Sequence, residues 1–468
     1  MDQPQTSPFV TSNGRASDHP AVQQFARHVN PAFVKLLGML GFGRLFVRAR
    51  DVWMWDHEGK EYLDFLAGFG AVSLGHNHPR LLERLRRFLS EEPLNLCHMS
   101  PSPQAGELAA ALAQRAGESL SVCLFSNSGA EAVDAGLKLA RAATGRAPVL
   151  YCRRAFHGTN LGVLSVMGDP HLRHPFEPLL PGCDAVPFGE LQPLEEALAT
   201  GRFGAFLVEP IQAEGGINLA PTGYLAAAQQ ICRRYGTLLI LDEVQTGLGR
   251  TGTLFAHQAE GFVPDVLTLA KALSGGIAPI GATLTSPEIN AWAYGTMSRC
   301  ELHSSTFGGN AFSCTAGREA LNILDEEGLV ANSAARGEQL IQGLRKRLQG
   351  HPLVREVRGR GLLVGVEFGP TGSGILNRLC PSLVEAITRG LFGQWVALRL
   401  LERGVVCALT YHRWNILRLE SPLTVQAEQV ERVADLVAEV LDEYRGVGVL
   451  LKDSTLRLLQ QFLTGWKF

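Results

Sequence analysis

Short apolar runs separated by amphipathic stretches dominate the chain between about residues 105 and 325. The clearest unit is an apolar run at 204–210, followed by a helical pattern over 222–235 and a second apolar run at 237–243. A connection of this length between two buried strands favours a βαβ crossover and therefore a parallel sheet. The pattern predicts an α/β fold in which strands and helices alternate.

The pattern changes on both sides of this region. Apolar stretches at 52–56 and 61–65 flank a His-Glu-Gly-Lys turn and predict a hairpin. Beyond about residue 330, a helical pattern over 330–349 precedes 354–368, which is typical of paired strands. We therefore divide the chain into a disordered N-terminus (1–20), a segment that joins a small domain (21–75), a large ligand-binding domain (76–329), a smaller C-terminal domain (330–446) and an additional amphipathic tail (447–468).

Composition narrows the class of protein. The chain has 468 residues, of which 46% are hydrophobic, and this is enough for a large core in two domains. The net charge of −2 argues against nucleic acid or an anionic membrane as the main partner. The nine cysteines form no CxxC pair, so we expect reduced thiols and a cytoplasmic location. We expect neither a signal peptide nor a transmembrane segment, because the first residues are polar and the apolar runs are short.

A lysine and an aspartate lie at the ends of two consecutive apolar runs. Asp242 closes the run that begins at residue 237, and Lys271 follows the run 266–270. Because ligands on parallel sheets bind at the carboxyl ends of the strands, we expect both side chains at one ligand-binding edge, together with Glu209. A lysine amine can hold an aldehyde cofactor as a Schiff base, and a carboxylate can keep a pyridine nitrogen protonated. The pair therefore indicates pyridoxal phosphate as the cofactor.

Several nearby motifs each allow two interpretations. Residues 125–131 form a small polar loop that opens a helix, which either binds a phosphate through its free N–H groups or carries a plain serine N-cap. Phe156 either stacks on a flat heterocycle or packs in the core. The polar loop 303–310 either contacts a phosphate or simply turns the chain. For Glu209 we favour a structural salt bridge.

The sequence Gly-Leu-Gly-Arg-Thr-Gly at 247–252 has the glycine spacing of a dinucleotide-binding loop, but its context differs. A charged segment separates it from the preceding strand, and the residues after it do not begin a convincing helix. An acidic residue at a strand end about twenty positions later is also missing. We therefore reject a nicotinamide oxidoreductase.

The order of the motifs is more specific than any one of them. From about residue 28 to 445, the chain resembles the class III aminotransferases that use pyridoxal phosphate, in particular the putrescine, ornithine and acetylornithine types. The resemblance implies a fold-type I enzyme with a mostly parallel seven-stranded sheet in the large domain and a smaller α+β domain. The motifs that carry it are Asn-Ser-Gly-Ala-Glu-Ala (127–132), Phe-His-Gly (156–158), Glu-Pro-Ile-Gln (209–212), Asp-Glu-Val-Gln-Thr-Gly-Leu-Gly-Arg-Thr-Gly (242–252), Ala-Lys-Ala-Leu-Ser-Gly-Gly (270–276), Ser-Thr-Phe-Gly-Gly-Asn (305–310) and Leu-Arg-Leu-x-x-Pro-Leu (417–423).

The resemblance also implies roles for individual residues. Lys271 would form the Schiff base and shuttle protons, and Arg418 would bind the α-carboxylate of glutamate or 2-oxoglutarate. Glu214 would pair with Arg418 when the other, carboxylate-free substrate binds. Thr306 would reach the phosphate of the neighbouring subunit, so the active unit would be a homodimer with shared sites, or a tetramer of two such dimers. The remaining site residues would be Asp242 at the pyridine nitrogen, Gln245 at the ring oxygen, Phe156 stacked on the ring with His157 next to it, Val244 beneath the ring, Ser128, Gly129 and Ala130 at the phosphate, and Phe69 at the substrate, with no metal ligand.

These roles imply a ping-pong transfer of an amino group between an ω-amine or aldehyde and glutamate or 2-oxoglutarate. The amine would be a diamine such as putrescine or a longer apolar amine. An apparent apolar insertion at 376–395, with the stretch 33–46 and the tail 447–468, serves either dimer packing or an apolar entrance for a long-chain or carrier-bound substrate. The alternatives are aminomutase or decarboxylating transaminase chemistry, or a non-catalytic binding protein on the same fold.

Overall fold

The large domain is built on one mostly parallel sheet. The structure is a computed structural model that describes residues 16–369 and 388–444. In this part of the chain, seven strands lie in the order β4-β12-β11-β10-β7-β5-β6, and β12 runs antiparallel to both of its neighbours. The predicted βαβ unit is confirmed, because β7 and β10 pair in parallel and α10 connects them. The elements of this domain are α4 (Pro79–Ser90), α5 (Pro103–Ala116), β4 (Val122–Ser126), α6 (Gly129–Thr144), β5 (Val149–Cys152), α7 (Leu161–Leu164), α8 (Pro170–Arg173), η2 (His174–Phe176), β6 (Cys183–Val186), α9 (Leu191–Leu198), β7 (Ala205–Val208), β8 (Ile211–Gln212), β9 (Asn218–Leu219), α10 (Tyr224–Arg234), β10 (Leu238–Asp242), η3 (Ala256–Glu260), β11 (Val266–Leu269), η4 (Lys271–Ser274), β12 (Gly281–Thr285), α11 (Pro287–Tyr294) and α12 (Ala311–Glu326).

Side chains of the central strands alternate between two hydrophobic clusters. In β10, Ile240 packs in the cluster that contains Val133 of α6. Its neighbours Leu239 and Leu241 belong to a larger cluster instead, and all three leucine and isoleucine side chains are fully buried. Because successive side chains of a strand point to opposite faces, apolar packing on both faces requires a continuous apolar run. The first polar side chains after these runs therefore mark the edge of the sheet.

The smaller domain combines two sheets from distant parts of the chain. Within the described residues, one has the order β13-β14-β17-β16 and the other the order β1-β2-β3-β15. The hairpin predicted at 52–65 is β2–β3, and the strand pair predicted at 354–368 is β13–β14, so both predictions are confirmed. The elements are η1 (Ala16–Asp18), α1 (Pro20–His28), α2 (Pro31–Leu40), β1 (Phe46–Arg50), β2 (Trp53–Asp56), β3 (Glu61–Asp64), α3 (Ala67–Gly70), α13 (Leu329–Arg347), β13 (Val354–Arg360), β14 (Leu363–Phe368), the π-helix η5 (Thr388–Phe392), α16 (Gly393–Glu402), β15 (Val405–Val406), β16 (Ala408–Leu409), β17 (Ile416–Leu419) and α17 (Ala427–Asp442).

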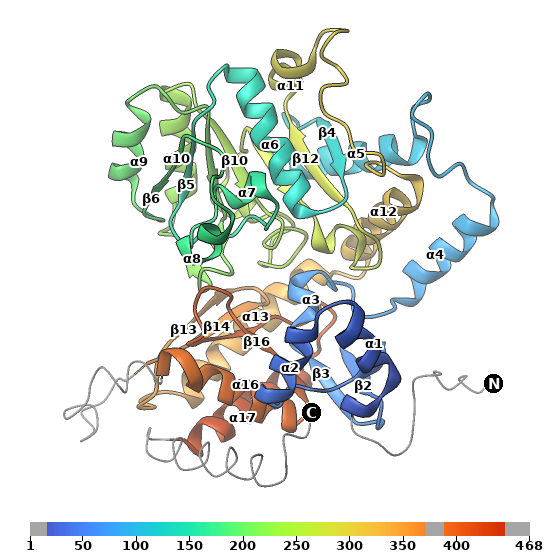
Figure 1. Ribbon diagram of the computed structural model, residues 1–468, viewed down its shortest axis with the longest axis vertical. Coiled ribbons are helices and arrows are strands. Elements are labelled where there is room, and N and C mark those ends of the chain that lie inside the picture. The colour runs from blue at the N-terminus through green and yellow to red at the C-terminus, as the bar shows by residue number, and fades with distance from the viewer. Residues whose placement is uncertain (1–15, 370–387, 445–468) are drawn as a thin grey trace.

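The N-terminal segment forms part of this smaller domain. β3 pairs in parallel with β15, with Leu63 opposite Val405. Figure 1 shows the N-terminal elements, in blue, beside the C-terminal elements, in orange and red, in the lower half of the molecule. The polypeptide therefore leaves the small domain after α3, builds the large domain, and returns.

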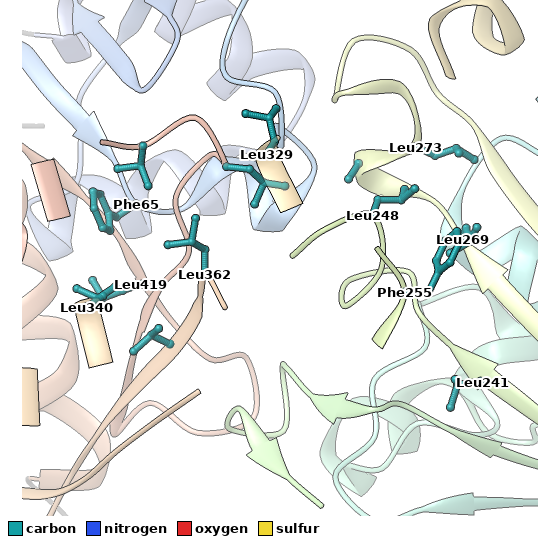
Figure 2. Close-up of a cluster of buried hydrophobic side chains, with 14 of the residues drawn as sticks. Phe65, Leu241, Leu248, Phe255, Leu269, Leu273, Leu329, Leu340, Leu362 and Leu419 are labelled. Atoms are coloured by element: carbon teal, nitrogen blue, oxygen red, sulfur yellow. The ribbon is translucent and has the colours of Figure 1, made fainter. Parts of the chain in front are cut away.

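One hydrophobic cluster reaches across both domains. Figure 2 shows Leu241 and Phe255 of the large domain on one side, and Phe65, Leu362 and Leu419 of the smaller domain on the other. All five side chains are fully buried. Because a packed core has low compressibility, this cluster holds the end of β17 at a fixed place relative to the carboxyl edge of the large sheet.

Three features expected from the sequence lie at the limits of the described chain. Residues 1–20 are expected to be disordered, but the turn η1 already precedes α1, and the buried side chain of His19 caps that helix by accepting from the N–H of Ala21 at 3.2 Å. Residues 376–387 of the apolar insertion and the whole tail 447–468 lie outside the described residues. At the described end of the insertion, Phe392 is fully buried against Phe368, with 5.0 Å between ring centroids, so this part belongs to the core.

Among the described helices, none combines the length and the apolar character needed to cross a membrane.

Candidate active site

A cavity of about 530 Å³ opens at the carboxyl edge of the large sheet. Its walls come from the segments that follow β5, β7, β10 and β11 and from the N-terminus of α6. Arg418, Glu214, Phe69 and Thr306 are not among the lining residues. The predicted site residues that do line the cavity are Ser128, Gly129, Ala130, Phe156, His157, Asp242, Val244, Gln245 and Lys271.

Lys271 begins η4 directly after β11, with a left-handed φ of 45°. Backbone strain of this kind in a non-glycine residue is concentrated at functional sites. Its Nζ donates to Oε1 of Gln245 at 2.7 Å. Burial lowers the pKa of Lys271 below that of free lysine, against the opposing effect of the Glu214 and Glu420 carboxylates. A lowered pKa leaves more of the neutral amine, which is the form that attacks an aldehyde carbon.

Asp242 is held in a defined orientation at the end of β10. Its Oδ2 accepts from Nδ1 of His157 at 2.6 Å, and its Oδ1 accepts from the backbone N–H of Val244 at 3.0 Å. Because a carboxylate can only accept, His157 must carry a proton on Nδ1. Both side chains are buried. His157 therefore orients the carboxylate, in addition to lining the cavity.

The loop before α6 is at once a serine N-cap and part of the cavity wall. The hydroxyl of Ser128 accepts from the N–H of Glu131 at 3.2 Å. The neighbouring N–H groups of this first turn have no partner within the helix and are the kind of group that binds a phosphate. A side chain at Gly129 would place its Cβ 2.6 Å from Cγ1 of Val244. Glycine at this position therefore allows the end of β10 and the start of α6 to approach one another closely.

Phe156 lies in the cavity wall, and a buried carboxyl fixes its backbone. The N–H of Phe156 donates to Oε1 of Glu209 at 3.0 Å, and the N–H of Ala213 donates to Oε2 at 3.3 Å. The prediction of a salt bridge at Glu209 is wrong for the described part of the chain, where backbone N–H groups take the place of a cation. Burial and the nearby charge of Asp242 raise the pKa of Glu209 well above its usual range. A carboxyl that takes up a proton more readily can be buried without a cationic partner.

Arg418 and Glu214 form a buried ion pair beside the cavity. Nη2 of Arg418 lies 2.6 Å from Oε2 of Glu214. Burial by itself raises the pKa of Glu214, but the charges of Arg418 and Lys271 outweigh burial and lower it overall. The ring of Phe69 lies over the guanidinium, with Cζ of Arg418 5.5 Å from the ring centroid. The structure thus brings together three residues that were predicted to contact the substrate.

Sequence reasoning missed Glu420. This fully buried carboxylate accepts from Nε2 of Gln245 at 3.1 Å and lies 3.7 Å from Nη1 of Arg418. The amide of Gln245 therefore donates to Glu420, whereas the resemblance implied donation to a ring oxygen. Residues two apart in extended chain point to the same side, so the position of Glu420 two residues after Arg418 was a usable signal.

These residues fit pyridoxal phosphate. The cavity offers an amine at Lys271, a buried carboxylate at Asp242, an aromatic face at Phe156 and a helix N-terminus at Gly129. Those groups match the aldehyde, the pyridine nitrogen, the ring and the phosphate of the cofactor, respectively.

Comparisons with known proteins identify the family of this chain. The family model for class-III aminotransferases matches residues 41–441. Aminotransferase PigE from Serratia sp. (strain ATCC 39006) is 34% identical over 94% of this chain, and the chain spans 56% of the length of that relative. The ornithine aminotransferase from Toxoplasma gondii is 32% identical with a TM-score of 0.77, over 86% of this chain and 92% of that one. The acetylornithine aminotransferase from Elizabethkingia anophelis is 30% identical with a TM-score of 0.71, over 88% and 99%.

The family match, over residues 41–441, covers both domains. The expected fold-type I architecture is confirmed by the seven-stranded sheet and the smaller domain of the described residues. The cofactor is pyridoxal phosphate. The chain therefore belongs to the class III aminotransferases, which are enzymes that depend on this cofactor.

Proposed function

We propose that the enzyme transfers an amino group between an ω-amine or aldehyde and the pair glutamate/2-oxoglutarate, in a ping-pong reaction. The amine is a diamine such as putrescine or a longer apolar amine. The observation that carries this proposal is the buried pair of Arg418 and Glu214, 2.6 Å apart. While Glu214 neutralises Arg418, the site suits an amine without a carboxylate. When Glu214 turns away, the guanidinium can bind the carboxylate of glutamate or 2-oxoglutarate with two parallel hydrogen bonds.

Aromatic side chains around the ion pair support an amine with an apolar stem. The backbone N–H of Tyr411 donates to Oε2 of Glu214 at 3.0 Å, and its ring lies 5.8 Å from that of Phe156. Phe69 covers the other partner of the pair, Arg418. Aromatic faces accept both methylene groups and ammonium groups, so they suit either amine class.

The residues of the chain divide the chemistry among them. When bound, pyridoxal phosphate supplies an aldehyde that captures the amine and a protonated ring that draws electrons from the substrate carbon. Lys271 would hold the cofactor through its Nζ amine, and the same amine would carry the proton that leaves the substrate carbon. Asp242, oriented by His157, would favour the protonated form of the ring nitrogen. Phe156 and Val244 would hold the ring by contact with it, and the N-terminus of α6 would bind the phosphate.

The holoenzyme is expected to form glutamate from 2-oxoglutarate with ω-amine donors. We suggest a donor series from putrescine to long-chain monoamines, with glutamate and aldehyde quantified together. Each donor alone should bleach the visible band of the bound cofactor without release of CO₂. Three outcomes would contradict the proposal: release of CO₂, transfer of the amino group within one molecule, or a cofactor band that no donor changes.

We propose further that the active unit is a homodimer with shared sites. Thr306 is exposed and lies outside the cavity wall, so it is free to reach the site of a second copy. The loop that carries it lies near the segment after α4, because the backbone N–H of Ala311 donates to the carbonyl of Asn95. Exposed apolar side chains that gather on these segments mark protein interfaces. They are Leu94, Met99, Met297, Leu302 and Phe307.

A double variant of this surface, Met297→Asp with Phe307→Asp, is expected to dissociate the dimer. Burying two unpaired carboxylates would raise the dissociation constant by at least about 100-fold. Sedimentation velocity measures the change, and cofactor retention should fall with it. Leu191→Asp is the matched control, since Leu191 is also exposed but begins α9, well away from α5 and α12 (Figure 1). A monomeric wild-type protein, or an unaffected dimer in the double variant, would refute this arrangement.

We also place the enzyme in the cytoplasm. Every cysteine among the described residues is free. Free thiols, both buried and exposed, are usual in proteins of a reducing compartment, which supports this location.

A further inference from the structure

Glu420 closes a buried chain of hydrogen bonds that starts at Lys271. Nζ of Lys271 donates to Oε1 of Gln245 at 2.7 Å. Nε2 of Gln245 in turn donates to the Glu420 carboxylate, at 3.1 Å to Oε2 and 3.3 Å to Oε1. A carboxylate offers only acceptors, so the amide must turn its NH2 group toward Glu420 and its oxygen toward the Lys271 amine, which donates. Glu420 thereby holds Gln245 with its oxygen toward Lys271.

Two arginines flank the same carboxylate. Nη1 of Arg418 lies 3.7 Å from Oε2 of Glu420, and Nε of Arg250 lies 3.6 Å from Oε1. Glu420 and Arg418 are 0% exposed, and Arg250 is 2% exposed. Charges at this depth interact with little screening by solvent. Glu420 therefore offsets part of the charge of Arg418, whether or not Glu214 is in place.

Packing around Glu420 holds its carboxylate in one position, whereas a carboxylate at the surface could move. A side chain at Gly70, whose φ is 82°, would place its Cβ 2.4 Å from Oε1 of Glu420. Glycine at position 70 therefore lets the backbone close over the carboxylate. The backbone N–H of Glu420 donates to the carbonyl of Phe65 at 2.8 Å, which pins the main chain as well. Glu214 differs, because it is held on one side by the segment that carries the exposed Tyr411.

We propose that Glu420 is a specificity-determining residue that favours diamines over dicarboxylates at this site. The inference rests on the proposed function, in which Arg418 takes the carboxylate of glutamate or 2-oxoglutarate. The fixed charge of Glu420 weakens the hold of Arg418 on that carboxylate and so speeds its exchange for the amine. With Glu214, it also places a second carboxylate beside Arg418, and Arg250 offsets part of that second charge. The negative and positive charges around Arg418 are then about equal in number, which accepts a distal ammonium group better than an unopposed guanidinium would.

Glu420→Gln is expected to reverse this preference. Calorimetric titration of the holoenzyme with glutarate, an unreactive dicarboxylate, should give a dissociation constant about five- to tenfold lower than wild type. In steady-state assays, KM for 2-oxoglutarate should fall about fivefold and KM for putrescine should rise about fivefold. KM for an amine whose far end carries no charge should change by less than about twofold. Glu420→Asp, which keeps the charge, should restore both KM values toward wild type. Glu420→Ser replaces the glutamine variant if that variant does not fold.

The control is Glu367→Gln in the neighbouring strand β14. Glu367 is also a buried carboxylate among arginines, 2.6 Å from Arg358 and 3.1 Å from Arg413, but its ion pairs in the described chain are with arginines other than Arg418. It should leave glutarate binding unchanged. The inference would be overturned if wild type and both Glu420 variants bound glutarate with equal affinity. It would also be overturned if none of the three proteins bound glutarate. Failure of the proposed function is a separate result, because the calorimetric comparison requires no turnover.

Discussion

Replacing Lys271 with alanine should abolish amine transfer, with a loss of at least about 10³-fold in kcat, because the variant lacks both the covalent anchor and the group that moves the proton. Lys271 is the amine that the structure places in the cavity wall, with its Nζ 2.7 Å from Gln245 and its pKa lowered by burial. Neighbouring donors cannot substitute for it, since Gln245 is an amide and Arg418 is held by Glu214. Single-turnover formation of glutamate measures the loss, and the amount of cofactor bound after gel filtration gives a second readout.

Lys60→Ala is the matched control for this variant. Lys60 also donates a hydrogen bond, to the carbonyl of Glu402, but it lies on the surface of the smaller domain. Its replacement should change kcat by less than about twofold, as is usual for surface substitutions away from a site. Amine transfer by Lys271→Ala at more than a tenth of the wild-type rate would show that the assignment of the anchor is wrong.

Asp242→Asn should lower kcat by about 10²-fold while the protein stays folded. The variant keeps the shape of the side chain but removes the charge that would keep the ring nitrogen protonated. It also disturbs the 2.6 Å hydrogen bond with His157, because an amide can present either oxygen or nitrogen to Nδ1. Rates of the amine half-reaction should fall more than the affinity for the cofactor, since the phosphate contacts at α6 are untouched.

Asp265→Asn separates this effect from the general cost of losing a largely buried, hydrogen-bonded carboxylate. Asp265 accepts from the N–H of Leu239 and from the amide of Gln229, before β11 rather than at the carboxyl edge of the sheet. It should lower the melting temperature without a comparable fall in kcat. If the two variants lose activity in proportion to their loss of stability, the role assigned to Asp242 fails.

The parts of the site that the sequence predicted are those that follow directly from a strand end. Asp242 and Lys271 each come immediately after a buried run, and parallel pairing of β10 with β11 places two such ends side by side. The pairing of Arg418 with Glu214 was accessible only through resemblance to a family, because the two residues lie in different domains. The prediction for Glu209 failed because its partners, the N–H groups of Phe156 and Ala213, are backbone groups in loops without periodicity.

By itself, the sequence determined the alternation of strands and helices, the edge of the sheet where the cavity opens and the family to which the chain belongs. Hydrophobic periodicity is a local property, so it can be read without knowledge of distant contacts. Only the tertiary structure decided that β3 pairs with β15, that Glu420 meets Gln245, Arg418 and Arg250, and that the amide of Gln245 points its oxygen at Lys271. Those contacts depend on distances of a few ångströms between groups far apart in the chain. The packing of the whole core across both domains sets such distances, and no local pattern encodes them.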